Sequence, residues 1–536
     1  MEWCVSAAPF MPDALDQLAA QARRLSLEGK PEEALWLLAA FVRTLNTAPG
    51  VPGNLFGSPA LDALWGELAQ ELPEPLPQQS AISPDPEAQI YVVSDIASTG
   101  GHTRLLLDMI RAQAERPQTV LLTNLFDRSA LAAEAAGLVP ENVAAIELAP
   151  EGSLLGKIHW LTHALERQPK ARVFLLPHHE DIAALAAVRR AARARVFFCH
   201  HADHHLALGL HVPAWRHLDV TAYSHAHCRH SLGVQNVAYL PLISAIVPAR
   251  EQAEFAASPG EAAFVTCSAG SPGKFARDYV FSYVEMIAQR LASFGGSHVH
   301  IGGLGEKEKT RLQRACAERG LEAARFREVP FVPSLAQAMA EEKVSVYLTS
   351  FPIAGARTAI EVMSSGTPIL GHRHFASDFL GGQGQLPEGT PIWHCAADFL
   401  ERLAEMAPEK QRALAAANRA FWERCHHPAR LAECLADDSF DLPPPPRAEA
   451  QRIDPLRLFL AGRSAEAALW DSLAHYAESH IALAEAKGKA AALKQSLLKA
   501  SERVVRLKEE HPAQQTPWTW KLLRPLARLE GWWRRR

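Results

Sequence analysis

The stretch SFPIAGARTAIEVMSSGTPILG, residues 350–371, decides the fold. A hydrophobic run at 344–348 precedes it and is typical of a buried strand. Small residues then form a loop. The apolar spacing from Ile360 to Met363 indicates a helix, which a Gly-Thr-Pro sequence ends at 366–368. An Ile-Leu pair begins the next strand. This order of strand, glycine loop, helix and strand predicts one unit of a doubly wound α/β domain.

The loop in this stretch is suited to bind a phosphate group. Backbone N–H groups in the first turn of a helix are unpaired and lie at the positive end of the helix dipole. Gly355 and Thr358 flank that turn, and Arg357 adds a positive charge beside it, unless it forms an outward ion pair instead. Glu361 follows one turn later, within reach of the hydroxyls of a ribose. We therefore predict a nucleotide site formed by Gly355, Arg357, Thr358 and Glu361.

The pattern F-P-x-x-G-x-x-T-x-x-E-x-x-x-x-G-T-P in the same stretch resembles the nucleotide-sugar loop of glycosyltransferases with the GT-B fold. The most similar group is the O-linked N-acetylglucosaminyltransferase family with its bacterial protein-glycosylating relatives. The resemblance covers roughly residues 88–437 and implies two Rossmann-like doubly wound domains that face a cleft. The sequence departs from the pattern at Ile353, where many retaining enzymes carry an acid, and this favours inversion. The alternative is a generic strand–helix unit of any doubly wound domain.

Composition narrows the classes of protein. The chain has 536 residues, of which 48% are hydrophobic, and this suffices for two to four domains with ordinary cores. The chain has a net charge of −4, whereas proteins that bind nucleic acids usually carry an excess of basic residues, so we do not expect a nucleic-acid-binding protein. The 8 cysteines show no C-x-x-C spacing, so we expect reduced thiols in a cytoplasmic protein. We find no secretory signal and no apolar run of about 18 residues, so we expect no membrane-spanning helix.

The N-terminal region at 1–72 is expected to be helical, with a proline-rich linker at 73–87. Apolar residues between 12 and 47 recur at helical spacing in two runs separated by Gly29-Lys30-Pro31, which predicts a helical hairpin. The hairpin is similar to a single tetratricopeptide-type unit, but no second copy follows. It either caps the catalytic body or serves as a peptide-binding arm.

The N-terminal α/β domain is predicted at 88–245. Strands are expected at 90–93, 120–122, 173–176, 196–198, 220–223 and 239–243, with helices between them. The loop at 94–104 contains a Gly-Gly turn and resembles the first loop of GT-B enzymes. In the O-linked N-acetylglucosaminyltransferase family a histidine of this loop lies at the reaction centre. The resemblance assigns that place to His102.

Histidines cluster after the expected strand at 196–198, in the sequence Cys-His-His-Ala-Asp-His-His at 199–205. Open α/β sheets place ligands at the carboxyl ends of their strands. Asp203 could orient His201 or His204 towards the sugar or the acceptor hydroxyl. Alternatively, the histidines only cap the strand and the next helix. A metal site is disfavoured because GT-B enzymes generally act without a bound metal and no Cys or Glu completes a clear ligand set. We predict His102, His201, Asp203 and His204 as the catalytic set, and no metal.

The C-terminal α/β domain is predicted at 246–440. It begins with a strand at 263–267, and its loop at 268–275 is expected to enter a helix at Ala276. A lysine at the end of a Gly/Ser loop is well placed to neutralise a diphosphate. Lys274 resembles the donor-site lysine of the same families, so we add Ser271 and Lys274 to the nucleotide site; a solvated loop lysine is the alternative. A helix at 411–421 and its continuation resemble the helices that return to the N-terminal domain in GT-B folds.

The last part of the chain follows a stiff proline run at 443–446. Residues 447–511 are expected to form a helical extension, of which 450–509 suits a homodimer contact. The tail at 512–536 combines 4 tryptophans with basic residues, as in amphipathic helices on anionic membranes. We expect peripheral contact of 517–536 with the cytoplasmic face of the inner membrane. The alternative is a tail docked on its own protein.

These observations predict a bacterial cytoplasmic glycosyltransferase of GT-B fold. It would transfer a sugar from a nucleotide donor, a UDP-sugar by resemblance, to a hydroxyl of a protein or surface glycan. The nucleotide sugar is a co-substrate, and we expect no cofactor and no nucleic-acid partner. Two alternatives remain: a nucleotide-sugar epimerase of the same fold, which needs no acceptor, and a non-catalytic GT-B scaffold or binding protein.

Overall fold

The computed structural model describes ten ranges of the chain and three further helical residues. The ranges are 11–47, 51–74, 88–97, 100–128, 130–150, 153–191, 195–201, 204–276, 279–375 and 377–446, and the three residues are Ser496, Lys499 and Arg503. The chain divides into two units, 1–462 and 463–536, and every element below belongs to the first. Asp203, the linker from residue 75, most of the extension at 447–511 and the whole tail at 512–536 lie outside the described residues.

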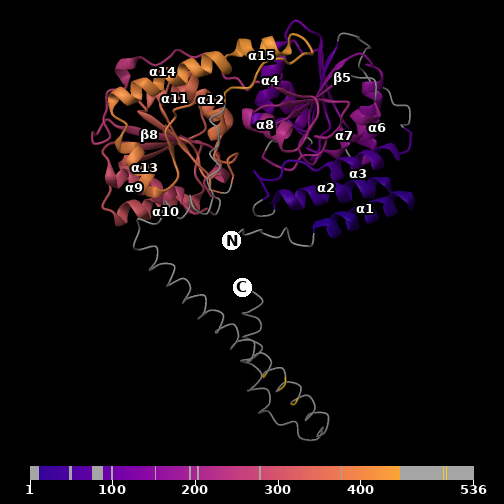
Figure 1. Ribbon diagram of the computed structural model, residues 1–536, viewed down its shortest axis with the longest axis horizontal. Helices are drawn as coiled ribbons and strands as arrows, with labels where there is room; N and C mark the ends of the chain where they lie inside the picture. The colour runs from indigo at the N-terminus through magenta and orange to yellow at the C-terminus, as the bar shows by residue number, and fades with distance from the viewer. Residues whose placement is uncertain are drawn as a thin grey trace. The chain divides into compact units, whose positions relative to one another are not determined.

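Two parallel sheets form the body of the first unit (Figure 1). The first has the strand order β3-β2-β1-β4-β5-β6-β7, and the second has the order β10-β9-β8-β11-β12-β13. The strands are β1 (Gln89–Val93), β2 (Gln118–Leu122), β3 (Ala145–Leu148), β4 (Arg172–Leu176), β5 (Arg195–His200), β6 (Arg216–Asp219), β7 (Val237–Tyr239), β8 (Val265–Ala269), β9 (Ser297–Ile301), β10 (Phe326–Val329), β11 (Val346–Leu348), β12 (Ile369–His372) and β13 (Ile392–Trp393). In each sheet the strand order reverses direction beside the first strand, β1 or β8, which is the doubly wound topology. The prediction of two such domains is confirmed.

Helices connect the strands and cover both faces of each sheet, as Figure 1 shows. They are α1 (Met11–Leu27), α2 (Pro31–Thr47), α3 (Pro59–Gln70), α4 (Gly101–Ala112), α5 (Leu131–Leu138), α6 (Leu154–Glu166), α7 (Ile182–Arg190), α8 (Ala222–His230), α9 (Tyr283–Ser293), α10 (Glu306–Glu318), α11 (Leu335–Glu341), α12 (Ala356–Ser364), α13 (Ala396–Ala404), α14 (Pro408–Cys425) and α15 (Pro428–Leu435). The strands β1, β2 and β4 are buried along their whole length, as expected of a parallel sheet that is covered twice. Within the described ranges, no helix is both long and apolar enough to cross a bilayer.

The predicted N-terminal hairpin is present as α1 and α2, and it packs on the first domain. Arg43 of α2 pairs with Glu180 at 2.6 Å. The Asn46 side chain donates to the carbonyl of Leu206 at 3.0 Å, and its oxygen accepts the amide of the same residue. The buried side chains of α2 belong to the same core as the helices α6 and α7. These contacts support the capping interpretation over that of a free peptide-binding arm.

Three sequence expectations for element positions are wrong or too long. The expected strand at 220–223 is instead the bend after β6 and the start of α8, because Thr221 caps that helix by accepting the amide of Ser224. No α-helix begins at Ala276. Pro272–Lys274 form only a 3₁₀ turn, η2, and α9 begins at Tyr283. The buried Phe275 ring ends the turn by packing 4.5 Å from Tyr283, between ring centres. The expected strand at 239–243 ends at Tyr239, before a proline that has no N–H to donate.

The chain crosses between the two domains twice, and the crossings are hydrogen-bonded to each other. The first follows β7 and the second joins α14 to α15. The indole of Trp422 donates to Ser244 Oγ at 2.8 Å, and His426 Nδ1 lies 2.8 Å from the carbonyl of Leu242. Beyond α15, Asp438 pairs with Arg172 of β4 at 2.8 Å. The expected return of the C-terminal helices to the first domain is therefore confirmed.

Candidate active site

The predicted phosphate loop leads from β11 into α12. Gly355 is the N-cap of α12, and its backbone φ of −111° lies in the extended region. Among the described residues, no side chain caps the first turn of this helix. The free N–H groups of that turn therefore keep the positive end of the helix dipole available for an anion.

The Lys274 side chain reaches this helix start from η2. A Cβ atom at position 355 would lie 2.5 Å from Lys274 Nζ and 2.8 Å from Thr358 Oγ1, so the ammonium can approach only because residue 355 is a glycine. Burial lowers the pKa of Lys274 to about 8, and no carboxylate of the described residues offsets this effect. The structure thus brings Lys274, Gly355 and Thr358 together, as the sequence predicted, around an uncompensated positive charge.

Arg357 of α12 forms an ion pair with Asp108 of α4, in the other domain. Burial lowers the pKa of the Arg357 guanidinium, and burial also raises the pKa of Asp108 against the opposing effect of Arg357. A second guanidinium nitrogen of Arg357, Nη1, is buried and has no hydrogen-bond partner among the described residues. Arg357 therefore forms an ion pair, but the pair is mostly buried and reaches the other domain rather than pointing outward, and it leaves one nitrogen for a further acceptor.

The other two residues predicted to bind the nucleotide, Glu361 and Ser271, lie in different environments. Glu361 lies one turn into α12, half-buried, and its Oε1 accepts the backbone amide of Leu335 at the start of α11 at 2.7 Å. A ribose hydroxyl would have to share this carboxylate with that amide. Ser271 is exposed, and its carbonyl accepts the amide of Lys274 at 3.0 Å. Its backbone therefore shapes the turn that carries the lysine.

His102 and His201 lie face to face in the first domain. Their ring centres are 4.3 Å apart and the rings are inclined by 3°. His102 Nε2 lies 3.1 Å from the carbonyl of Leu176, and His201 Nε2 lies 2.9 Å from that of Pro177. A carbonyl oxygen can only accept, so each imidazole carries its proton on Nε2 and keeps a lone pair on Nδ1. Within the described chain neither Nδ1 makes a hydrogen bond.

Both imidazoles are neutral at pH 7. Burial lowers the pKa of His102 to about 4, although the carbonyl of Leu176 opposes this effect. Burial lowers the pKa of His201 well below its ordinary value, and the adjacent His102 adds to the shift. A neutral imidazole with a free lone pair can accept a hydroxyl proton, so the pair has the protonation state that a general base needs.

A buried hydrogen-bond cluster holds the strand ends beneath these histidines. Asp181, the N-cap of α7, accepts the hydroxyls of Ser94 and Thr123, which follow β1 and β2. Ser94 Oγ in turn accepts the amide of His178 at 2.6 Å, after β4. The cluster fixes three neighbouring strand ends and thereby the carbonyls of residues 176 and 177 that orient His102 and His201.

The remaining predicted histidine lies elsewhere at the same edge. The His204 ring centre is 4.0 Å from that of His205, and the His204 carbonyl accepts the amide of Gly53 at 2.7 Å. Asp203 lies outside the described residues. The structure thus brings His102 and His201 together, but the described contacts of His204 are with His205 and the segment after α2.

Sequence reasoning missed His178 and His179. They follow β4 directly, and their ring centres are 3.9 Å apart, with His205 4.5 Å from His179. The sequence contained the signal for them, because Pro-His-His-Glu at 177–180 comes immediately after the strand at 173–176.

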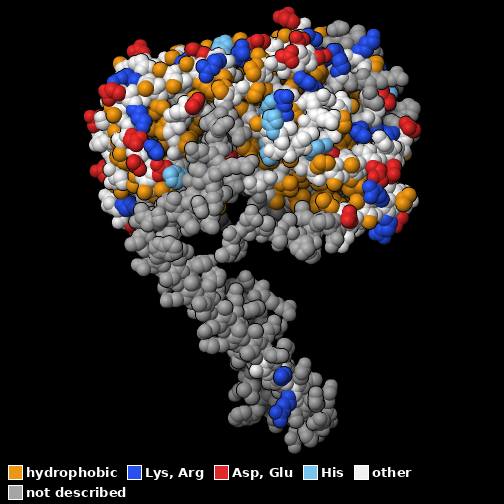
Figure 2. Space-filling model, in the orientation of Figure 1, with side chains coloured by type: hydrophobic (Ala, Val, Ile, Leu, Met, Phe, Trp, Pro, Cys, Tyr) orange, Lys and Arg blue, Asp and Glu red, His pale blue; other side chains and the backbone are white. Residues whose placement is uncertain are grey.

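Histidines also gather at the surface over α8, as Figure 2 shows.

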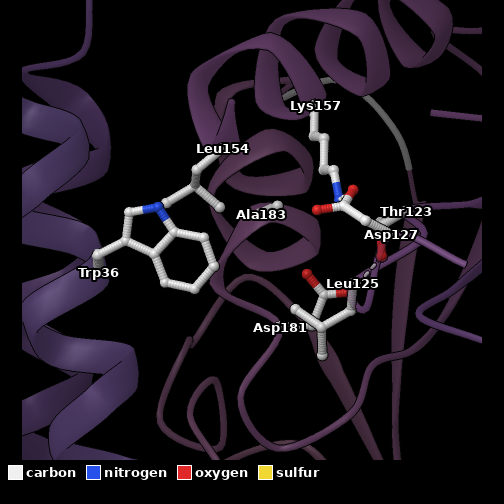
Figure 3. Close-up of a pocket in the computed structure, with 8 residues that line it drawn as sticks. All are labelled: Trp36, Thr123, Leu125, Asp127, Leu154, Lys157, Asp181 and Ala183. Carbon is white, nitrogen blue, oxygen red and sulfur yellow. Dashed lines mark hydrogen bonds and ion pairs between the residues drawn. The ribbon is translucent and has the colours of Figure 1, made fainter. Parts of the chain in front are cut away.

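A small pocket lies between the hairpin and the first domain (Figure 3). The Trp36 ring of α2 faces it across from the ends of β2 and α7. Its charged groups are paired with protein atoms: Lys157 Nζ donates to Asp127 Oδ1 at 2.7 Å and to the carbonyl of Asn124 at 2.5 Å. The lining residues are Trp36, Thr123, Leu125, Asp127, Leu154, Lys157, Asp181 and Ala183. None of the predicted nucleotide-binding residues is among them.

The Arg357–Asp108 pair connects the two halves of the site. Asp108 belongs to α4, the helix whose first turn carries His102, and Arg357 belongs to the first turn of α12 beside Lys274. Two doubly wound domains and a C-terminal helix that returns to the first domain are the architecture of the GT-B fold.

No family model matches the chain, and the curated proteins contain no match to it. Among solved structures, the chain is similar to HepE of Anabaena in complex with UDP and glucose, with 13% identity over 65% of this chain and 98% of that chain and a TM-score of 0.46. It is similar to a mutant O-GlcNAc transferase of Thermobaculum terrenum, with 13% identity over 79% and 82% and a TM-score of 0.43. It is also similar to TarM, with 8% identity over 67% and 100% and a TM-score of 0.48.

Proposed function

We propose that this chain is a glycosyltransferase that uses a nucleotide sugar, UDP-linked, and transfers the sugar to a hydroxyl of a protein or glycan acceptor. The observation that carries the proposal is the half-buried ammonium of Lys274 at the start of α12. Helix dipoles disfavour cations at an N-terminus, yet Lys274 lies at this one with no carboxylate among the described residues beside it, whereas the charge of Arg357 is offset by Asp108. A diphosphate would neutralise the charge of Lys274.

The same charge would serve the reaction. When the bond between the sugar and the diphosphate breaks, negative charge grows on the leaving diphosphate. Lys274, the α12 N–H groups and the Thr358 hydroxyl would stabilise it, with Arg357 Nη1 as a further donor. Because these groups supply the positive charge, the proposed chemistry requires no resident cofactor.

The acceptor would be activated on the opposite side of the site. We assign Nδ1 of His102 as the atom that accepts the hydroxyl proton of the acceptor, and His201 as its stacked neighbour that keeps the ring in place. A hydroxyl that approaches from the first domain suits attack on the face of the sugar opposite to the diphosphate, which is the inverting course. Closure of the domains over the donor would limit hydrolysis.

Turnover of UDP-sugars with and without acceptor tests this proposal. UDP release that requires an added protein or glycan acceptor supports a transferase, and a His102→Asn variant should lose it while still binding UDP. Interconversion of the sugar without an acceptor would instead identify an epimerase. Failure of UDP, GDP, ADP and TDP to bind in calorimetry would overturn the nucleotide site and favour a scaffold.

A further inference from the structure

Four side chains with metal-binding atoms meet inside the first domain, and none of them is among the residues assigned above, although His200 directly precedes His201. They are His200 at the end of β5, His217 and Asp219 of β6, and Cys228 of α8. The side chains of His200 and Asp219 are 0% exposed, and that of His217 is 2% exposed. One ligand atom from each residue lies within 4.8 Å of the other three. The fold thus brings four buried polar side chains together between two strands and a helix.

Four buried atoms of this cluster make no hydrogen bond of good geometry to a described residue. Two of them, His217 Nε2 and Asp219 Oδ2, face each other as an ion pair at 3.2 Å. Buried carboxylate oxygens are normally paired, because an unpaired one has lost its water without replacement. A cation bound by both lone pairs would satisfy the two atoms at once. The other nitrogen of each imidazole ring, His200 Nε2 and His217 Nδ1, also has no hydrogen-bond partner among the described residues. A cation would leave these two atoms unpaired, because they are not the proposed ligand atoms.

The distances in the cluster agree with a tetrahedral zinc site. Zinc bonds of about 2.0 Å to nitrogen or oxygen and about 2.3 Å to sulfur place neighbouring ligand atoms about 3.3–3.6 Å apart. Cys228 Sγ lies 3.6 Å from His200 Nδ1 and 3.5 Å from Asp219 Oδ1, and the His217–Asp219 distance is 3.2 Å. His200 Nδ1 and Asp219 Oδ1, at 2.8 Å, would have to separate by a few tenths of an ångström. The 3.2 Å distance joins His217 to the other carboxylate oxygen, Oδ2, so the Asp219 side chain would have to turn to bind with one oxygen.

We propose that His200, His217, Asp219 and Cys228 bind one Zn²⁺ ion. Nitrogen, thiolate and carboxylate are the ligand types that zinc prefers. The thiol releases its proton on binding, so Zn²⁺, one thiolate and one carboxylate sum to zero charge, which suits a fully buried site. All four positions are filled by protein atoms, so the ion is structural and does not bind substrate.

The ion would fix the ends of β5 and β6 against α8. The residue after His200 is His201, whose ring stacks on His102, so the ion would hold one backbone unit next to the proposed catalytic pair. On its other side, α8 carries Tyr223, whose ring centre lies 5.5 Å from that of Phe379 in the second domain. The sequence cluster at 199–205 lacked a clear ligand set because two of these ligands come from β6 and the fourth comes from α8.

Metal content of the purified full-length protein tests the proposal directly. By inductively coupled plasma mass spectrometry we expect one zinc per chain in the wild-type protein. The Cys228→Ser and His217→Asn variants should contain no zinc. Cys199→Ser and His225→Asn are matched controls: Cys199 is buried on the neighbouring position of β5, and His225 is buried on α8. Both controls should keep one zinc per chain. A metal-free wild-type protein that also takes up no zinc under reducing conditions would overturn the proposal.

Cobalt substitution and X-ray absorption keep the test decisive if a variant fails to fold. Wild-type protein loaded with Co²⁺ should show the visible bands of tetrahedral cobalt and a thiolate charge-transfer band in the near ultraviolet. At the zinc edge of the wild-type protein, we expect one sulfur at about 2.3 Å and three lighter atoms at about 2.0 Å. A shell without sulfur, or bound zinc that Cys228→Ser retains with an unchanged spectrum, would refute these ligands.

Discussion

Replacing Lys274 with methionine should stabilise the empty protein. Burial lowers the pKa of this lysine from 10.5 to about 8, so the folded state disfavours its ammonium. The full shift is equivalent to about 3 kcal/mol at 1.36 kcal/mol per unit. For a half-buried group that water partly screens, we expect about 1–2 kcal/mol. Methionine keeps the length of the side chain and removes the charge, so the free energy of unfolding at pH 7 should rise by that amount.

The pH dependence of this effect has a definite sign. Between pH 8 and 10.5 the unfolded chain still holds the Lys274 proton while the folded protein has lost it, so wild-type stability gains with pH in this window. The advantage of the variant should therefore be complete below pH 8 and vanish by about pH 10.5. Urea unfolding of both proteins at pH 7 and pH 9.5 measures the difference.

UDP binding should respond in the opposite direction. A hydrogen bond to a charged group contributes about 1.5–3 kcal/mol, so Lys274→Met should raise the Kd for UDP about 10- to 100-fold at pH 7. Wild-type affinity should fall above pH 8, where the free lysine loses its proton, whereas the affinity of the variant should not change there. Isothermal titration calorimetry at pH 7 and pH 9 measures both effects.

Lys157 provides the matched control, because its ammonium is buried but paired with Asp127. Lys157→Met should lower the free energy of unfolding and leave UDP binding unchanged. The reasoning about Lys274 is refuted if Lys274→Met is no more stable than wild type at pH 7, or if it binds UDP with the wild-type Kd.

Four further predictions follow from the same contacts. Gly355→Ala should raise the Kd for UDP about tenfold by displacing Lys274 Nζ without lowering Tm, since a φ of −111° suits alanine; calorimetry and thermal unfolding report the two effects. Asp108→Asn should release Arg357 and lower the Kd for UDP, and an unchanged Kd would show that Arg357 does not reach the diphosphate. His102→Asn should reduce acceptor-dependent turnover about 10²- to 10⁴-fold with UDP affinity retained; equal loss of both would argue for a structural role. Burial lowers the pKa of His426 to about 4, so its neutral form should add stability that is lost as pH falls from about 6.5 to 4, by up to about 3 kcal/mol; His426→Asn should flatten this part of a urea midpoint against pH plot.

Local patterns were enough to predict much of the fold. The stretch at 350–371 has its strand, loop and helix where the spacing of apolar residues indicated, and the hairpin breaks at the expected glycine. The loop composition was enough to predict that Lys274 lies beside Gly355 and Thr358. The helix expected directly after Lys274 was wrong, because the buried Phe275 ends the turn. Aromatic packing of this kind depends on Tyr283, which belongs to another element, so loop composition does not reveal it.

The parts of the site that sequence reasoning missed depend on contacts between distant segments. Asp108 and Arg357 are 249 positions apart, and neither residue signals the other in the sequence. The tautomers of His102 and His201 follow from backbone carbonyls of β4, whose position is set by sheet order. His217 and Cys228 come beside His200 only because β5, β6 and α8 are neighbours. Patterns within one element were enough to predict candidate site residues. The residues that contact them could be found only from the order of strands and helices in the fold.

The two crossings between the domains constrain how one domain can move relative to the other. Two chain segments that are hydrogen-bonded to each other, through Trp422, Ser244, His426 and Leu242, resist twisting and sliding of one domain against the other. Bending about the line through both segments keeps these bonds but would break the Arg357–Asp108 ion pair and the hydrogen bond from Ser377 Oγ to the carbonyl of Gly53. The crossings therefore favour one motion, a hinge rotation about the line through both segments. Each opening about this hinge would separate the same two surfaces. Each closing would return α4 and α12 to the same relative position, so that Arg357 pairs with Asp108 again.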